Sequence, residues 1–173
     1  MLRAPCLMAL ALSSLIAHAQ TAPPDPAALV AENTHSFSYT DTKLEGPGAA
    51  FLLDQTARSQ FVLLGEQHMD HAIPVFAGAL YQMLHEQHGF RHVVVEQDPV
   101  AIDEALMPPR RADVQALAKH ARRYPSLFEF DTDEDLAFLA FASSLEPGPD
   151  AILGVEQTTG AIRYLEELVE LAE

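Results

Sequence analysis

Three short apolar runs constrain the fold of this chain more than any other feature of the sequence. They span residues 61–64, 93–95 and 152–155, and each leads directly, or through one glycine, into a Glu-Gln pair. A short, wholly apolar run is typical of a strand buried on both faces, as in a parallel sheet. We therefore predict an α/β fold with a mainly parallel sheet of three or four strands, joined by crossover helices.

The stretches between these runs have the pattern of helices. Residues 74–88 have an apolar stripe at helical spacing, and Gly89 supplies a typical helix end. A helix here would join the first two strands as a right-handed βαβ unit. We also predict an edge strand over 36–40 and further helices over 26–32, 49–58, 99–107 and 113–122, over 136–145 and from 161 onward.

The predicted sheet is small for its class, because an average sheet has about five or six strands. The last predicted helix runs to Glu173 without a helix-stop signal. We therefore expect residues 49–173 to be an incomplete, truncated α/β domain, the N-terminal part of a larger one.

The N-terminus has the features of an export signal. Arg3 supplies the positive start, residues 7–16 form an apolar core, and the small residues of 17–19 form a cleavage site. We predict a signal peptide over 1–19, cleaved near Ala19, and a Pro-rich, extended lead-in over 20–48. Cys6 is the single cysteine, so the exported chain would have no disulfide. The predicted location is periplasmic or secreted.

The charge of the chain excludes one class of partner. The formal net charge is −15, and no cluster of Lys and Arg is longer than two residues. A nucleic-acid-binding surface needs a basic patch, so nucleic acid is excluded as a partner. No apolar run after the leader has the length of a transmembrane segment. We expect a small-molecule partner, as the site described next suggests.

The ends of the apolar runs suggest a site. Ligands of parallel sheets collect at the carboxyl ends of the strands. Glu66 and His68 follow the first run, and Glu96 follows the second. A carboxylate and an imidazole together can activate water as a general base. We predict Glu66, His68 and Glu96 as catalytic residues.

Three further polar residues are candidates for substrate contacts. Asp70 and His71 extend the loop after the first run, and Glu156 follows the third. Structural alternatives remain open. Residues 65–68 can be a polar loop that hydrogen-bonds the start of a helix, and Asp70 and His71 can simply be solvated. Glu96 has an alternative as well, an ion pair with Arg91.

Two motifs resemble metal sites without having their spacing. His85 and His88 are three residues apart, whereas the zinc-protease motif needs four. The aspartates at 131, 133 and 135 lack the glycine of a calcium loop at the sixth position. We predict that these acidic residues and Thr132 cap the helix that follows.

The order of these motifs resembles a known superfamily. The segments 61–68, 89–91 and 93–96, with 152–156 as a later strand, look like the erythromycin esterase-like superfamily. Its relatives include the ChaN-like haem-binding proteins and the Tiki-type proteins. The resemblance extends closely over residues 60–100 and loosely over 128–173.

The resemblance implies a hydrolase without a cofactor. An esterase of this superfamily would use Glu66, His68 and Glu96 to activate water for ester or lactone hydrolysis. In that hypothesis His68 is the base, Glu66 orients it, and Glu96 helps to hold the water.

Two alternatives stay open. ChaN-like relatives have a Gly-Glu-x-His motif with nearby histidines that can bind iron or haem. The corresponding candidates here are His68, Asp70 and His71. The chain would then be a haem- or iron-binding protein without turnover. It would otherwise be an inactive, truncated remnant.

Overall fold

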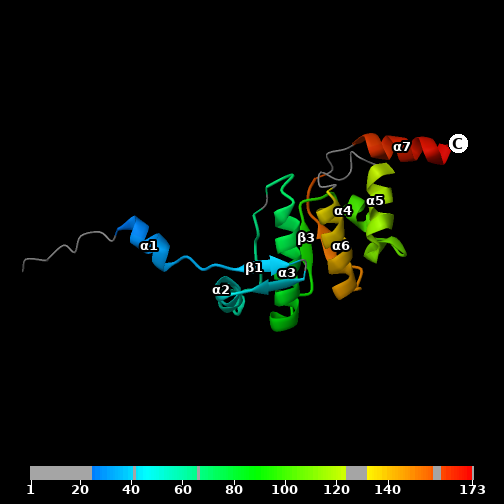
Figure 1. Ribbon diagram of the computed structural model, residues 1–173. Coiled ribbons are helices and arrows are strands. Elements are labelled where there is room, and N and C mark those ends of the chain that lie inside the picture. Colours follow the sequence, from blue (N-terminus) through cyan, green and yellow to red (C-terminus); the bar gives the residue numbers. More distant parts are fainter. Residues whose placement is uncertain (1–24, 41, 66, 124–131, 158–160, 173) are drawn as a thin grey trace, which may run out of the picture. The chain divides into compact units, whose positions relative to one another are not determined.

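The computed structural model describes residues 25–40, 42–65, 67–123, 132–157 and 161–172 (Figure 1). Residues 25–34 belong to one compact unit and the chain from His35 onward to a second. The first unit contains α1 (Pro26–Glu32), where the Asp25 side chain accepts a hydrogen bond from the Ala27 N–H. The predicted signal peptide lies outside the described residues. None of the described helices is both long and apolar enough to cross a membrane.

The second unit begins with an antiparallel hairpin. Strands β1 (Ser38–Thr40) and β2 (Lys43–Glu45) pair with each other, and α2 (Pro47–Thr56) follows them. The predicted edge strand is therefore confirmed in a shorter form. Phe37 and Tyr39 place their rings 5.3 and 5.7 Å from that of Phe76, which anchors the hairpin on the next helix.

That helix is α3 (Ala72–His88), and it ends as the sequence predicts. Gly89 adopts a left-handed conformation with φ of 72°, and its N–H bonds the Leu84 carbonyl oxygen. A left-handed residue just after the last turn is a common way to satisfy the final carbonyl groups, and glycine adopts it without steric cost. Helix α3 packs against α6 (Asp133–Leu145), which begins where Thr132 accepts a hydrogen bond from the Asp135 N–H. The capping prediction is thus confirmed.

The core of the unit is formed by the elements around α6. These include α4 (Pro99–Ala105), the 3₁₀ turn Arg110–Ala112 and α5 (Val114–Arg123), and α7 (Ala161–Ala172) follows at the end of the chain. The apolar side chains that these elements bury belong to one cluster, which includes Tyr81, Ile102, Leu117, Leu139 and Ile152. All of these helices except the 3₁₀ turn lie where the apolar spacing predicts them.

Two of the predicted central strands pair as expected. Strand β3 (Val93–Val95) runs parallel to β4 (Ile152–Gly154), with Val93 opposite Ile152 and Val95 opposite Gly154. Backbone hydrogen bonds continue past the strand ends, from the Val155 N–H to the Val95 oxygen and from the Glu156 N–H to the Gln97 oxygen. The α/β class and the parallel pairing are confirmed.

The first of the three predicted strands, 61–64, is absent, so the prediction of a three- to four-stranded sheet is wrong. Within the described residues both sheets have two strands, and 61–64 is not a strand. Leu63 is 94% exposed and Phe61 82% exposed. Among the described residues, this segment makes none of the backbone hydrogen bonds to β3 or β4 that a strand of the sheet would need. The physical reason is that an apolar run supplies only a local preference for extended backbone, whereas a strand also needs a neighbour in register to pair with.

Gly154 permits a close approach between β4 and the segment after β3. A Cβ atom at this position would lie 2.6 Å from the Gln97 carbonyl oxygen and 2.8 Å from the Pro99 nitrogen. Both atoms belong to the backbone, which cannot rotate away as a side chain can. The position therefore requires glycine because of the available space.

We predict that Gly154→Ala destabilises the fold by about 1–3 kcal/mol, the usual cost of forcing extra volume into a packed site. Urea unfolding monitored by circular dichroism measures this change. The matched control is Gly148→Ala, where nothing lies within 4 Å of the added Cβ. Equal stability of the two variants would contradict the prediction.

Candidate functional site

A mostly apolar cavity of about 840 Å³ lies beside β3. The segment 59–64 forms one side, and α3, α6 and β3 form the others. The apolar residues of its wall include Phe61, Leu64, Ile73, Leu80, Leu84, Val93, Val95, Phe138 and Leu139. The segment that was expected to be a strand is therefore a wall of this cavity.

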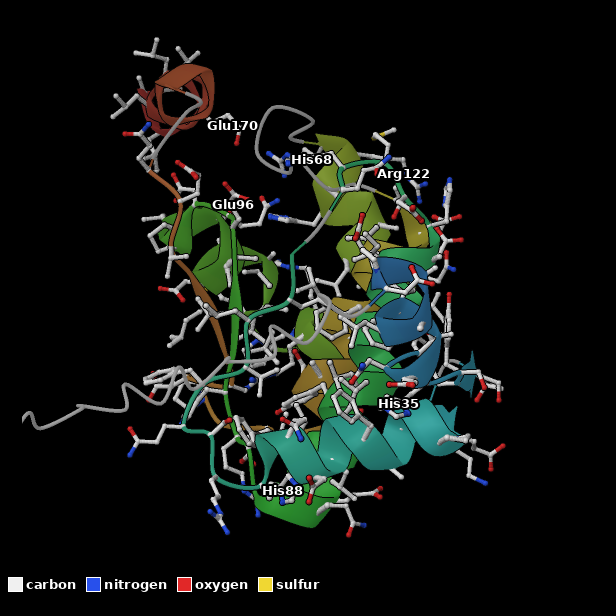
Figure 2. The ribbon with its side chains drawn as sticks, turned by 90° about the vertical axis from the view of Figure 1, so that its left-hand side faces the viewer. His35, His68, His88, Glu96, Arg122 and Glu170 are labelled. Atoms are coloured by element: carbon white, nitrogen blue, oxygen red, sulfur yellow. The ribbon has the colours of Figure 1, made fainter. Side chains whose placement is uncertain are left out.

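His68 and Glu96 both line the cavity. His68 belongs to the loop before α3, and Glu96 comes directly after β3. Figure 2 shows the two residues at the same end of the unit, and both are exposed there. An imidazole and a carboxylate, separated in the sequence, thus line one mostly apolar hollow. Glu66, the third predicted catalytic residue, lies outside the described residues.

Asp70 lines the cavity and also has a structural role. Its Oδ1 accepts a hydrogen bond of 2.8 Å from the Ala72 N–H, at the first residue of α3. One of the otherwise unpaired N–H groups of the helix start is satisfied in this way. The sequence predicted a substrate contact or a solvated loop for Asp70, and the structure instead shows it bonded to the start of α3.

His71 is directed to an ion pair and is not among the cavity-lining residues. Its Nδ1 lies 2.7 Å from Glu134 Oε2, at the first turn of α6. The hydrogen bond with Glu134 raises the pKa of His71 and lowers the pKa of Glu134. This pair connects the loop that contains His68 to α6.

Glu156 is not brought to the cavity wall, although its neighbour Val155 is. Its Oε1 accepts a hydrogen bond of 2.8 Å from the Gln157 N–H. Its own N–H donates to the Gln97 carbonyl oxygen at 3.0 Å. The observed role of Glu156 is to extend the pairing of the two strand ends.

The polar residues at the other end of the cavity have structural partners. His88 bonds the Leu53 carbonyl oxygen at 2.9 Å, and His92 bonds the Asp150 carbonyl oxygen at 2.8 Å. Arg91 lies 3.2 Å from Glu146 and 2.8 Å from the His85 ring. Figure 2 shows His88 at the end of the unit opposite His68. The end with His68 and Glu96 is therefore the better candidate for chemistry.

Gln97 is a wall residue that the sequence analysis did not name as a site residue. Only 4% of it is exposed, and it lines the cavity next to Glu96. Within the described part of the chain, neither its Oε1 nor its Nε2 has a hydrogen-bond partner. The sequence signal that could have identified Gln97 is the Glu-Gln pair that follows each apolar run. Only the glutamate of each pair was considered as a site residue.

The side chains that could bind a metal do not form a metal centre within the described residues. No group of three or more His, Cys, Asp or Glu side chains there could hold a metal ion. The region can instead offer an imidazole, a carboxylate and an apolar hollow.

Comparisons with known proteins identify no relative of this chain. No family model, no curated protein and no solved structure matches it.

The ion pair of His71 gives a prediction about pH. The pKa of His71 in the folded protein is raised above 6.5. The stability that protonated His71 contributes through the ion pair is therefore complete below pH 6.5, and it is lost as the pH rises through the pKa of the folded protein. Because the pKa of Glu134 is lowered below 4.5, its contribution is present above that value and is lost as pH falls through the folded pKa. We expect Glu134→Gln to bring the pKa of His71 back towards 6.5, measured by NMR titration of the ring protons.

The matched control for this titration is Glu86→Gln, which removes a carboxylate from the other end of α3. An unchanged pKa of His71 in Glu134→Gln would show that the pair does not form in solution.

Proposed function

We propose that this protein is an exported hydrolase of the erythromycin esterase-like superfamily that cleaves an ester or lactone in a small, largely apolar molecule. The observation that supports this proposal is the shared position of His68 and Glu96 on the wall of one apolar cavity. The sequence resemblance assigns the same two residues to the activation of water.

The chemistry of the proposal needs a base and a site for the reacting group. His68 takes a proton from water as the water oxygen attacks the acyl carbon, and the proton then passes to the departing alcohol oxygen. Glu96 holds the water by accepting its second hydrogen bond. Glu66 orients the imidazole of His68, a role that follows from the resemblance.

The cavity supports a small-molecule substrate. Its volume of about 840 Å³ lies within the range of roughly 300–1,000 Å³ that is usual for ligand pockets. Its wall is mainly apolar, with polar residues at both ends, and His68 and Glu96 lie at one of them. An apolar part of the substrate would fill the interior, with the ester group at the exposed end.

Haem binding without turnover is a second candidate. The observation that favours it is an exposed imidazole, His68, beside a large apolar cavity. One axial histidine can hold a haem iron, and the porphyrin needs an apolar pocket. Iron held by protein side chains alone has less support, because the described residues contain no group of three suitable ligands.

The hydrolase proposal predicts that His68→Ala loses about 10²–10⁴-fold in kcat, the usual contribution of a general base. A panel of p-nitrophenyl esters and aliphatic lactones measures the turnover. Glu96→Gln preserves the shape of the side chain and is expected to lose less. The matched control is His35→Ala, because His35 stacks on Phe51 at 4.6 Å and is not a cavity residue.

No turnover by the wild type, or turnover equal to that of His68→Ala, would remove the hydrolase proposal. The haem candidate is tested separately, by titration with haemin. It predicts a Soret shift in the wild type that is lost in His68→Ala and kept in His35→Ala. If the chain shows neither turnover nor a Soret shift, the inactive remnant is the hypothesis left among the three.

A further inference from the structure

Strand β3 has one paired edge and one open edge. On the paired edge, the Val93 N–H donates to the Ala151 carbonyl oxygen at 2.8 Å, and the Val95 oxygen accepts from the Val155 N–H at 3.1 Å. The backbone groups of successive strand residues point to opposite edges, so the N–H and C=O of Val94 point away from β4. Within the described residues, no backbone hydrogen bond joins Val94 to a third segment.

The cavity lies along this open edge. All three residues of β3 line it, whereas no residue of β4 does. A hollow above a face of the sheet would be lined by both strands and by alternate residues of each. Here the lining includes every residue from 88 to 97. Strand β3 therefore presents its edge to the cavity, and 57% of Val94 is exposed there.

The two faces of a strand added at this edge would meet different surroundings. Val93 and Val95 pack on the buried apolar cluster of the unit, whereas Val94 belongs to the opposite, exposed face. The side chains of an added strand alternate in the same way. Every second side chain would face the apolar wall, and the others would face solvent.

An open strand edge is matched by few kinds of ligand. Its N–H and C=O groups pair best with the backbone of another extended chain, which repeats the same groups at the same spacing. An alkyl chain or a ring can fill the hollow, but it bonds neither backbone group of Val94. A second copy of the chain is disfavoured, because each copy has a net charge of −15 and two copies repel each other. The edge therefore favours a separate peptide.

The charged residues of the wall limit the ends of such a peptide. Asp70 and Glu96 line the cavity with His68, and Figure 2 shows Glu96 and His68 at the same end. A free carboxylate placed there would be repelled by these two carboxylates, whereas an ester is neutral. Arg91, at the other end, is already paired with Glu146.

We propose that the open edge of β3 binds the backbone of a short apolar peptide, and that the substrate of the cavity is a peptide ester. The peptide bonds the N–H and C=O of Val94, and its ester lies beside His68. This inference rests on the proposed function for the reaction, but the pairing with β3 does not depend on hydrolysis.

The first test uses a peptide that has no ester, acetyl-Val-Thr-Val-Thr-Val-amide, with the full chain. Amide hydrogen exchange, followed by NMR, measures the protection of single N–H groups. At saturating peptide, we expect exchange at the Val94 N–H to slow by about tenfold or more. The Val93 N–H, which already bonds Ala151, is the internal control and should be protected with and without peptide.

Unchanged exchange at Val94, or no binding of the peptide in isothermal titration calorimetry, would overturn the inference. Protection of Val94 without peptide that grows with protein concentration would assign the edge to a second copy, and this result would overturn it as well.

The matched variants are Val94→Pro and Val94→Ala. Proline removes the N–H that points to the cavity, and the bonds of Val93 and Val95 to the β4 side are kept. Alanine removes a similar part of the side chain and keeps the N–H. We expect Val94→Pro to lose about tenfold or more in peptide affinity and Val94→Ala to stay near the wild type. Equal affinities of the two folded variants would contradict the pairing.

Two N-methylated peptides test the same pairing with the unaltered protein, so this result does not depend on the folding of a variant. One peptide carries N-methyl groups on its valines and the other on its threonines, so each blocks one edge of the extended ligand. Because only one edge of the ligand can face β3, we expect one peptide to lose about tenfold in affinity and the other to keep it. Equal affinities of both would overturn the inference.

Failure of the proposed function leaves a different result. If no ester is hydrolysed but Val94→Pro loses the peptide, the hydrolase proposal fails and the pairing with β3 stands. If esters are hydrolysed through His68 but the Val94 N–H is not protected, the pairing fails and the hydrolase stands.

Discussion

The parallel pairing of β3 with β4 is the constraint on which the candidate site depends. It sets Val95 opposite Gly154 and continues as a hydrogen bond from Glu156 to the Gln97 carbonyl oxygen. Because Gly154 has no side chain, the segment after β3 can pack directly against β4. The strand pair, and not the side chains themselves, therefore determines where Glu96 and Gln97 lie.

The cavity is lined by β3 and by the segment 61–64, which does not pair with that strand. Val94 and Leu153 are 57% and 38% exposed, so one face of the strand pair is not covered within the described residues. A paired strand would lie about 4.8 Å from β3 and would exclude a ligand. In the structure a cavity of about 840 Å³ is lined by both 61–64 and β3. An apolar segment that does not join the sheet thus becomes a wall for an apolar ligand.

The polar groups around the cavity divide into two sets. At the end near His88, the histidines and Arg91 bond carbonyl oxygens or carboxylates that hold helices and loops together. At the other end His68 and Glu96 are exposed, and the ion pair of His71 with Glu134 ties the His68 loop to α6. A site with one structural end and one exposed end suits a ligand that enters with its apolar part first.

The sequence by itself determined the local elements. The stop of α3 at Gly89, the cap at Thr132 and the parallel strands at 93–95 and 152–154 follow from conformational preference and apolar spacing. The tertiary structure alone decided that 61–64 is not a strand, that His71 pairs with Glu134, and that the Gln97 amide has no hydrogen-bond partner within the described residues. A strand needs a neighbouring strand to pair with, an ion pair needs a partner far along the chain, and an unpaired amide is defined by its neighbours in space. None of these three conditions is present in a local stretch of sequence.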